Sequence, residues 1–200
     1  MTTATKVKER GILFSGEMVR AILDGRKTQT RRPVKKQPPA GWNRTGWYHM
    51  PIMGWTNEPE PAGNWHTVKC PYGRPGDRLW VRETAKLRSI GPDENQIDLA
   101  YRATGSVSDP LFPLSPKPYS LFKWTPSIHM PRWASRITLE ITNVRVERIR
   151  SIPAPDFYRE GYNDGANFKN VKAFEASWNA TYPGSWDRND WVWVIDFKKI

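Results

Sequence analysis

A short cationic run near the N-terminus combines residue types that could bind phosphate. It covers residues 26–33, Arg-Lys-Thr-Gln-Thr-Arg-Arg-Pro, and follows Gly25, which ends a predicted helix. Positive charge is favourable there because the helix dipole leaves partial negative charge at a helix C-terminus. The cations could bind a phosphate while the threonine hydroxyls contact and position a nucleic-acid backbone, without any catalysis. The side chains available for such contacts are Arg26, Lys27, Thr28, Thr30, Arg31 and Arg32.

The common catalytic and metal signatures are absent from the sequence. It has no glycine-rich phosphate loop, nucleophile elbow or paired catalytic carboxylate motif. His66 lies four residues before Cys70, but no second pair of ligands stands at a recognisable spacing. We therefore expect no metal and no cofactor, and we interpret His49, His66 and His129 as loop or packing residues.

The charge of the chain favours a polyanionic partner. The formal net charge is +11 in 200 residues. Residues 1–36 hold ten Lys and Arg against three acidic residues, so this segment alone carries +7. Neutralising phosphates releases condensed counterions, which drives association. We therefore expect contact with a nucleic acid or a nucleotide.

Cysteine usage and hydropathy indicate the compartment. The chain has a single cysteine, Cys70, so it forms no internal disulfide and suits a reducing environment. No stretch approaches the roughly 18 apolar residues of a membrane span, and the N-terminus lacks the apolar core of a secretory signal. The sequence predicts a cytoplasmic protein with no membrane partner.

Hydrophobic periodicity predicts the elements that must position the cationic run. Ile12 to Phe14 read as a short strand, and Ser15 can cap a helix with apolar residues at helical spacing up to Leu23. Alternation then predicts a strand at 78–84, after a turn at 74–77. Further predicted elements are a strand from 136 to 146 with a bulge or turn at Thr142-Asn143, a helix at 153–160 ended by Gly161, a helix capped by Asn170, and a strand at 191–197.

Two long segments carry little periodicity. Residues 33–70 are rich in Pro and Trp, which is typical of a lid, a binding loop or an insert. Their four tryptophans could clamp the segment onto the protein, and an exposed one could stack on a base. We interpret residues 86–125 as a connection with one possible strand at 97–101. The length and composition predict a single domain of residues 1–200, and the strands and helices predicted along it make the fold class α+β. The last strand, apolar on nearly both faces, favours a barrel or a covered sheet.

Three blocks resemble the ASCH family, whose members have a small β-barrel like that of pseudouridine-synthase-and-archaeosine-transglycosylase (PUA) modules. Residues 22–31, Ile-Leu-Asp-Gly-Arg-Lys-Thr-Gln-Thr-Arg, resemble its helix, Gly, Lys-Thr-x-Thr signature. Residues 75–84 and 127–136 are similar to later blocks of the longer ASCH proteins of phages and prophages. The resemblance runs from end to end, although the inserts match little. It implies a PUA-like barrel flanked by short helices, with residues 33–70 as insert or lid, and RNA more than DNA as partner. A phage-encoded member would work in the host cytoplasm.

The resemblance also implies an activity. Some short ASCH proteins are amidohydrolases that remove the acetyl group from the exocyclic amine of acetylcytidine, with a Lys, a Thr and a Glu. By position these fall on Lys27 as base, Thr30 as nucleophile and Glu160 as proton relay or holder of the substrate amine. A lysine can take a hydroxyl proton once its pKa falls from about 10.4 towards neutrality. Neighbouring arginines and partial burial would lower the pKa of Lys27 in that way.

Other functions remain open on the same residues. A PUA-like module could bind RNA or DNA without catalysis, and the same Lys and Glu could serve a ribonuclease. A structural role in a phage particle is a further alternative. Arg82 and Glu83 could line the cleft, or could instead form a structural ion pair with each other. The later blocks contribute four candidate binding residues, Arg82, Glu83, Arg132 and Trp133.

Overall fold

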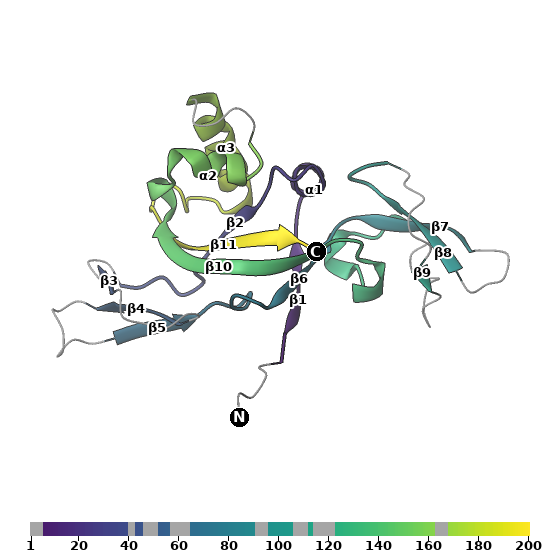
Figure 1. The fold of residues 1–200 in the computed structure, drawn as a ribbon. Coiled ribbons are helices and arrows are strands. Elements are labelled where there is room, and N and C mark those ends of the chain that lie inside the picture. The colour runs from purple at the N-terminus through teal and green to yellow at the C-terminus, as the bar shows by residue number, and fades with distance from the viewer. Residues whose placement is uncertain are drawn as a thin grey trace. The chain divides into compact units, whose positions relative to one another are not determined.

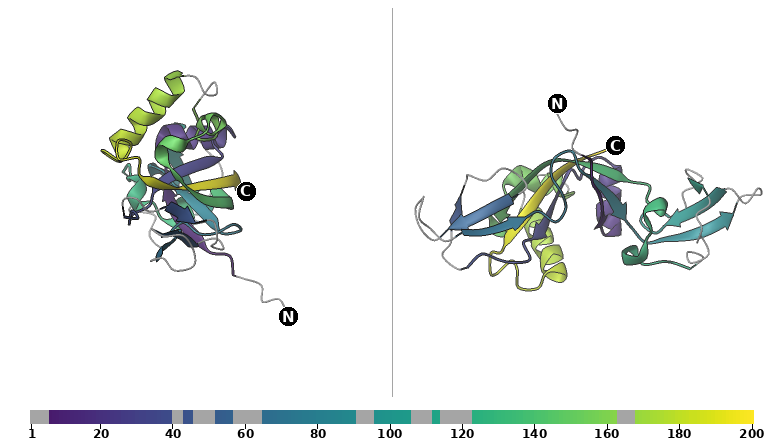
Figure 2. Two further views of the ribbon diagram at one scale, coloured as in Figure 1. Left: turned by 90° about the vertical axis from the view of Figure 1, so that its left-hand side faces the viewer. Right: turned by 90° about the horizontal axis from the view of Figure 1, so that it is seen from below.

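The computed structural model describes residues 6–39, 43–45, 52–56, 65–90, 96–105, 112–113, 123–162 and 168–200 (Figures 1 and 2). The fold is mixed α+β with a mostly sheet core and few helices, which confirms the predicted class. The described strands do not close into a barrel. None of the described helices has the length and apolar character needed to span a membrane.

The chain divides into two compact units, and each unit draws on separate stretches of sequence. Unit 1 comprises Met1–Gly25, Arg78–Leu139 and Lys199–Ile200, and unit 2 comprises Arg26–Asp77 and Glu140–Lys198. Neither unit is a contiguous segment of the chain. The expectation of one domain over residues 1–200 stays a prediction.

Unit 1 begins with the predicted strand and capped helix. Strand β1 (Glu9–Leu13) pairs in parallel with β6 (Arg78–Arg82). A Cβ at Gly11 would lie 2.9 Å from side-chain atoms of β6, which explains the glycine at this position. Helix α1 (Gly16–Leu23) starts at Ser15, whose hydroxyl accepts a bond from the amide of Met18, and its apolar face is buried. The capped helix is confirmed, whereas the strand begins earlier than the predicted 12–14 and ends before Phe14.

The segment 86–125, which we interpreted as a connection, instead contains part of a small sheet. Strands β7 (Ala85–Ile90), β8 (Gln96–Tyr101) and β9 (Phe112–Pro113) lie antiparallel in that order. Only the strand at 97–101, now β8, is confirmed. The short 3-10 helices η2 (Ser127–His129) and η3 (Arg132–Ala134) follow. A core cluster of unit 1 consists of Ala85, Leu87, Leu99, Tyr101, Met130 and Ala134.

The main sheet of unit 2 joins strands that are distant in sequence. Strands β10 (Thr138–Arg148), β11 (Trp191–Lys199) and β2 (Gln29–Pro33) are neighbours in that order. β11 and β2 are antiparallel, with Ile195 opposite Thr30. β10 continues through Thr142-Asn143, so of the predicted bulge or turn the turn is wrong. The side on which residues are buried nevertheless changes at this point, since Ile141 and Val144 are both buried.

Two helices pack on this sheet through an aromatic core. The 3-10 helix η4 (Ile149–Ser151) leads into α2 (Ala154–Arg159), and α3 (Phe168–Thr181) lies beside α2 (Figure 1). Gly161, with φ +97°, follows α2 as predicted. Because α3 begins at Phe168, Asn170 lies inside the helix and the predicted cap is wrong. The shared core contains Ile149, Phe157, Phe174, Trp178, Val192 and Val194.

The 33–70 segment contains a three-stranded antiparallel sheet. Its strands are β3 (Asn43–Thr45), β4 (Ile52–Thr56) and β5 (Trp65–Lys69). These three strands were not predicted from the sequence, where the segment carries little periodicity. Trp42, Trp47 and His49 lie outside the described residues. A role as insert or lid stays a prediction.

Candidate functional site

Lys27 and Glu160, the base and the acid implied by the resemblance, are in direct contact in unit 2. The Nζ atom of Lys27 lies 2.7 Å from Oε2 of Glu160 and donates a second bond of 2.9 Å to the Glu160 carbonyl. The two side chains are 0% and 3% exposed. Backbone hydrogen bonds fix the chain next to Lys27. The Thr28 amide donates to the Arg159 carbonyl, and the Thr28 carbonyl accepts from the Phe197 amide.

The end of helix α2 positions Glu160. Glu160 is the C-cap residue, and its amide donates 2.8 Å to the carbonyl of Asp156. The Arg26 guanidinium donates 2.8 Å to the carbonyl of Gly161. Arg26 and Lys27 therefore both bind carbonyls just past a helix C-terminus, where the partial negative charge of the helix attracts cations.

Arg31 holds the other oxygen of Glu160. Its Nη1 lies 3.0 Å from Oε1 of Glu160, and its Nη2 lies 2.7 Å from Asp156 and 3.1 Å from Glu147. Nη1 also donates 2.5 Å to Gln29. The Arg31 side chain is completely buried. Its guanidinium is thus engaged by carboxylates, so in this arrangement it orients Glu160 and does not present itself to a phosphate.

Arg145 on β10 extends the charged cluster. It lies 2.6 Å from Glu147, 2.9 Å from Asp156 and 2.6 Å from Asp196. Gln29 donates 2.6 Å to the other oxygen of Asp196. The sequence analysis did not predict that Arg145, Glu147, Asp156 and Asp196 belong to this site. One signal was available, since Asp196 is an acid in an otherwise apolar strand. The cluster consists of Lys27, Arg31, Arg145, Glu147, Asp156, Glu160 and Asp196.

The pKa of Lys27 is lowered from its ordinary value of 10.5. Burial is the largest cause, because it removes water from the ammonium group. The charge and hydrogen bond of Glu160 oppose the shift, whereas Arg32 and Arg31 reinforce it. A lowered pKa favours the neutral amine, which is the form that can accept a proton.

Thr30 lies close in sequence but on the other side of β2. It is buried opposite Ile195, and strand alternation places it on the face opposite Gln29 and Arg31. Among the described residues, Thr30 takes no part in the hydrogen bonds of Lys27 and Glu160. Arg32 shares its face and is partly buried. The structure therefore brings together two of the three expected catalytic residues.

The four candidates from the later blocks lie in unit 1. Glu83 is buried and forms a bidentate pair with Arg136, at 2.9 and 3.0 Å. The alternative of an Arg82–Glu83 pair is wrong, because successive residues of an extended chain point in opposite directions. Arg82 instead lies over the Trp80 ring at 5.3 Å and donates to the carbonyl of Ile128.

The remaining two candidates have structural contacts. Arg132 donates 3.0 Å to Glu9 near the surface. Trp133 is partly buried and packs against the core of unit 1. Both contacts are made within unit 1.

The chain matches no protein-family model, no curated protein and no solved structure. The resemblance to ASCH domains therefore rests on the three sequence blocks. Within the part of the chain that the structure describes, no three His, Cys, Asp or Glu side chains group as metal ligands.

Proposed function

We propose that the protein is an ASCH-type hydrolase with a PUA-like fold, which removes an acyl group from the exocyclic amine of a modified cytidine. The observation that carries this proposal is the 2.7 Å contact between Lys27 and Glu160. The family resemblance assigned these two residues to one site although 133 positions separate them. The lowered pKa of Lys27 adds support, because a general base must reach its neutral form.

The proposed reaction has two steps. Neutral Lys27 takes the proton of the Thr30 hydroxyl, whose oxygen bonds to the acyl carbon. The carbon–nitrogen bond then breaks, and the amine of the cytidine receives a proton from Lys27 by way of Glu160. Water hydrolyses the resulting ester, which releases the carboxylic acid and restores the hydroxyl. This route requires Thr30 to come within hydrogen-bond reach of Lys27 when substrate binds.

A chromatographic assay tests the proposal directly. The purified protein is incubated with acetylcytidine and other acylated cytidines, and released cytidine is measured. We expect Lys27→Ala, Thr30→Ala and Glu160→Gln each to lower the rate by about 10²- to 10⁴-fold. Thr30→Ser, which keeps the hydroxyl, should retain activity, as should the exposed control Arg159→Gln. If the folded parent protein releases cytidine from none of these substrates, the proposal is wrong.

Nucleic-acid binding is the second candidate, favoured by the net charge of +11 and by an exposed aromatic residue in unit 1. Trp124 lies beneath Lys86 at 5.0 Å and Arg102 at 5.5 Å. Cations next to an aromatic ring suit single-stranded RNA, whose bases stack and whose phosphates attract the cations. RNA affinity should fall steeply with salt. Cleavage of intact RNA that is lost in Lys27→Ala would instead indicate a ribonuclease.

A further inference from the structure

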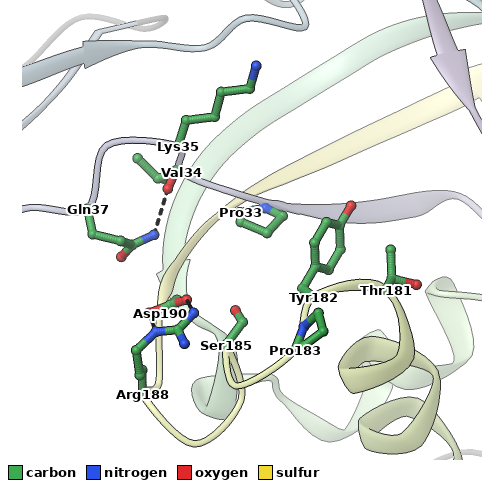
Figure 3. A pocket seen from close by; sticks show the side chains of 10 residues that line it. All are labelled: Pro33, Val34, Lys35, Gln37, Thr181, Tyr182, Pro183, Ser185, Arg188 and Asp190. Carbon is green, nitrogen blue, oxygen red and sulfur yellow. Dashed lines mark hydrogen bonds and ion pairs between the residues drawn. The ribbon is translucent and has the colours of Figure 1, made fainter.

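Unit 2 contains a pocket that none of the proposed catalytic residues lines. It has a volume of about 400 Å³ and lies between the chain that leaves β2 and the loop that joins α3 to β11 (Figure 3). Pro33 and Val34 form one side, and Tyr182 and Pro183 form the other. This volume lies within the range of small-molecule sites, roughly 300–1,000 Å³. Pro33, Tyr182 and Pro183 offer apolar surface to a flat ring among polar and charged side chains.

Hydrogen bonds hold the first side of the pocket in place. Gln37 donates 2.7 Å to the Val34 carbonyl and 2.9 Å to the Trp191 carbonyl. Its own side-chain oxygen accepts the Trp191 amide at 2.8 Å. One side chain therefore ties the chain after β2 to the start of β11.

The opposite side is equally well ordered. The Tyr182 ring packs against Trp178 with the ring centroids 4.7 Å apart. The amide of Ser185 donates to the carbonyl of Tyr182, and the carbonyl of Ser185 accepts from the amide of Asp190, both at 3.1 Å. Both walls are therefore preformed, which lowers the entropic cost of binding a ligand.

A buried hydroxyl group in this pocket has no partner in the part of the chain that the structure describes. Ser185 is 2% exposed, and its Oγ makes no hydrogen bond among the described residues. Figure 3 shows this oxygen directed into the space framed by Pro33 and Tyr182. Buried hydroxyl groups are nearly always satisfied, because an unmet one loses its water without compensation. A polar atom of a bound ligand would satisfy it.

A fixed cation lies next to this hydroxyl. Arg188 is exposed and forms a bidentate pair with Asp190, with Nε–Oδ1 at 3.2 Å and Nη2–Oδ2 at 2.8 Å. The pair fixes the guanidinium at the edge of the pocket, which Asp190 also lines, and Nη1 takes no part in the pair. Lys35 extends away from Ser185 at the rim, where it adds positive potential (Figure 3).

From these features we infer that this pocket binds one nucleotide. The base packs between Pro33 and Tyr182 with its polar edge at the Ser185 hydroxyl. The phosphate lies at Arg188, because a guanidinium recognises phosphate oxygens through charged hydrogen bonds. A free 5′-mononucleotide and the 5′-terminal nucleotide of an RNA present the same chemistry. The site is separate from Lys27 and does not depend on the proposed hydrolase.

Calorimetric titration and amide NMR shifts test this inference. The probes are the four ribonucleoside 5′-monophosphates, the matching nucleosides and a 5′-phosphorylated RNA tetranucleotide. Ser185→Ala and Tyr182→Ala should each weaken nucleotide binding about tenfold. Arg188→Gln should weaken nucleotides about tenfold while leaving nucleosides unchanged. Ser177→Ala, an exposed hydroxyl on α3 that does not line the pocket, is the matched control and should bind as the parent does.

Further measurements keep the outcomes distinct. Ser185→Ala should not lower Tm, because the hydroxyl makes no bond within the described fold. Lys27→Ala should bind nucleotides as the parent does, so loss of hydrolysis and loss of this site can be told apart. Tighter binding of the tetranucleotide than of mononucleotides identifies an RNA end as the ligand, and the reverse identifies a free nucleotide. No binding at about 1 mM, or equal binding by the parent and the pocket variants, overturns the inference.

Discussion

The guanidinium of Arg31 lies 3.0 Å from Oε1 of Glu160, the carboxylate oxygen that Lys27 does not contact. Each oxygen of this buried carboxylate therefore meets a different cation. Such an arrangement fixes the plane of the carboxylate. In the proposed reaction, proton exchange with Lys27 takes place at Oε2, while Arg31 holds the carboxylate in position.

Removal of Arg31 should be among the most destabilising changes in unit 2. Arg31→Met removes one cation that Glu160, Asp156 and Glu147 share. Uncompensated buried charge typically costs about 3–5 kcal/mol in the free energy of unfolding. Equilibrium unfolding in denaturant measures this loss.

Arg159 provides the matched control, because it approaches the Asp156 carboxylate, which Arg31 also contacts, from the solvent side. Its Nη1 lies 3.7 Å from Oδ1 of Asp156, and its side chain is 54% exposed. Water and salt screen this pair, so Arg159→Met should change the free energy of unfolding by about 0–1 kcal/mol. Equal losses in the two variants would contradict a structural role specific to Arg31.

The burial of Lys27 should appear in the pH dependence of stability. Its pKa in the folded protein is lowered below 10.5, so between these two values the unfolded chain binds more protons. The free energy of unfolding contributed by Lys27 must then rise with pH across that window and level off above 10.5. The difference in this free energy between the parent and Lys27→Met, followed over alkaline pH, isolates the effect. A difference that falls with pH would contradict the assigned direction.

The Glu83–Arg136 pair should couple energetically within unit 1. The side chains are 3% and 10% exposed and share two hydrogen bonds. Glu83→Gln and Arg136→Met should each destabilise the protein, and the double variant should lose less than the sum. A double-mutant cycle is expected to yield a coupling energy of about 0.5–3 kcal/mol. Strict additivity would show that the contact contributes nothing.

The N-terminal cap of α1 should make a small contribution. The Ser15 hydroxyl accepts the Met18 amide at 3.4 Å, which is long for a hydrogen bond. Ser15→Ala should therefore cost near the low end of the usual range, about 0.5–2 kcal/mol. Thermal unfolding measures this cost, and Ser15→Asp, which restores a cap acceptor, should recover it.

Local signals were sufficient to predict several elements. The capped and amphipathic helix α1, the helix α2 that ends before Gly161, and the apolar strand β11 all follow from residues close in sequence. Strand β2 was not predicted, because Gln29 and Arg31 are polar yet buried and give no hydrophobic alternation. Their burial depends on carboxylates contributed by distant segments, which periodicity does not register.

The site was predicted in part for the same reason. The family resemblance placed Lys27 beside Glu160, and the structure brings them together. It gave no indication that Arg31 would be surrounded by acids, because Glu147, Asp156 and Glu160 follow more than 100 residues later. Ion pairs of this kind depend on strand order and helix placement, and these are fixed by long-range packing.

The pairing of β2 with β11 determines when the site can form during synthesis. Thr30 leaves the ribosome long before Ile195, its partner across the sheet. Until β11 emerges, the edge of β2 that pairs with it has no neighbour. Lys27 likewise has to wait for Glu160, which follows it by 133 residues. Contacts of such long range close slowly, because the entropy of a large loop must be overcome first. The nascent chain should therefore expose this edge, and chaperone binding before residue 191 would protect it from premature association.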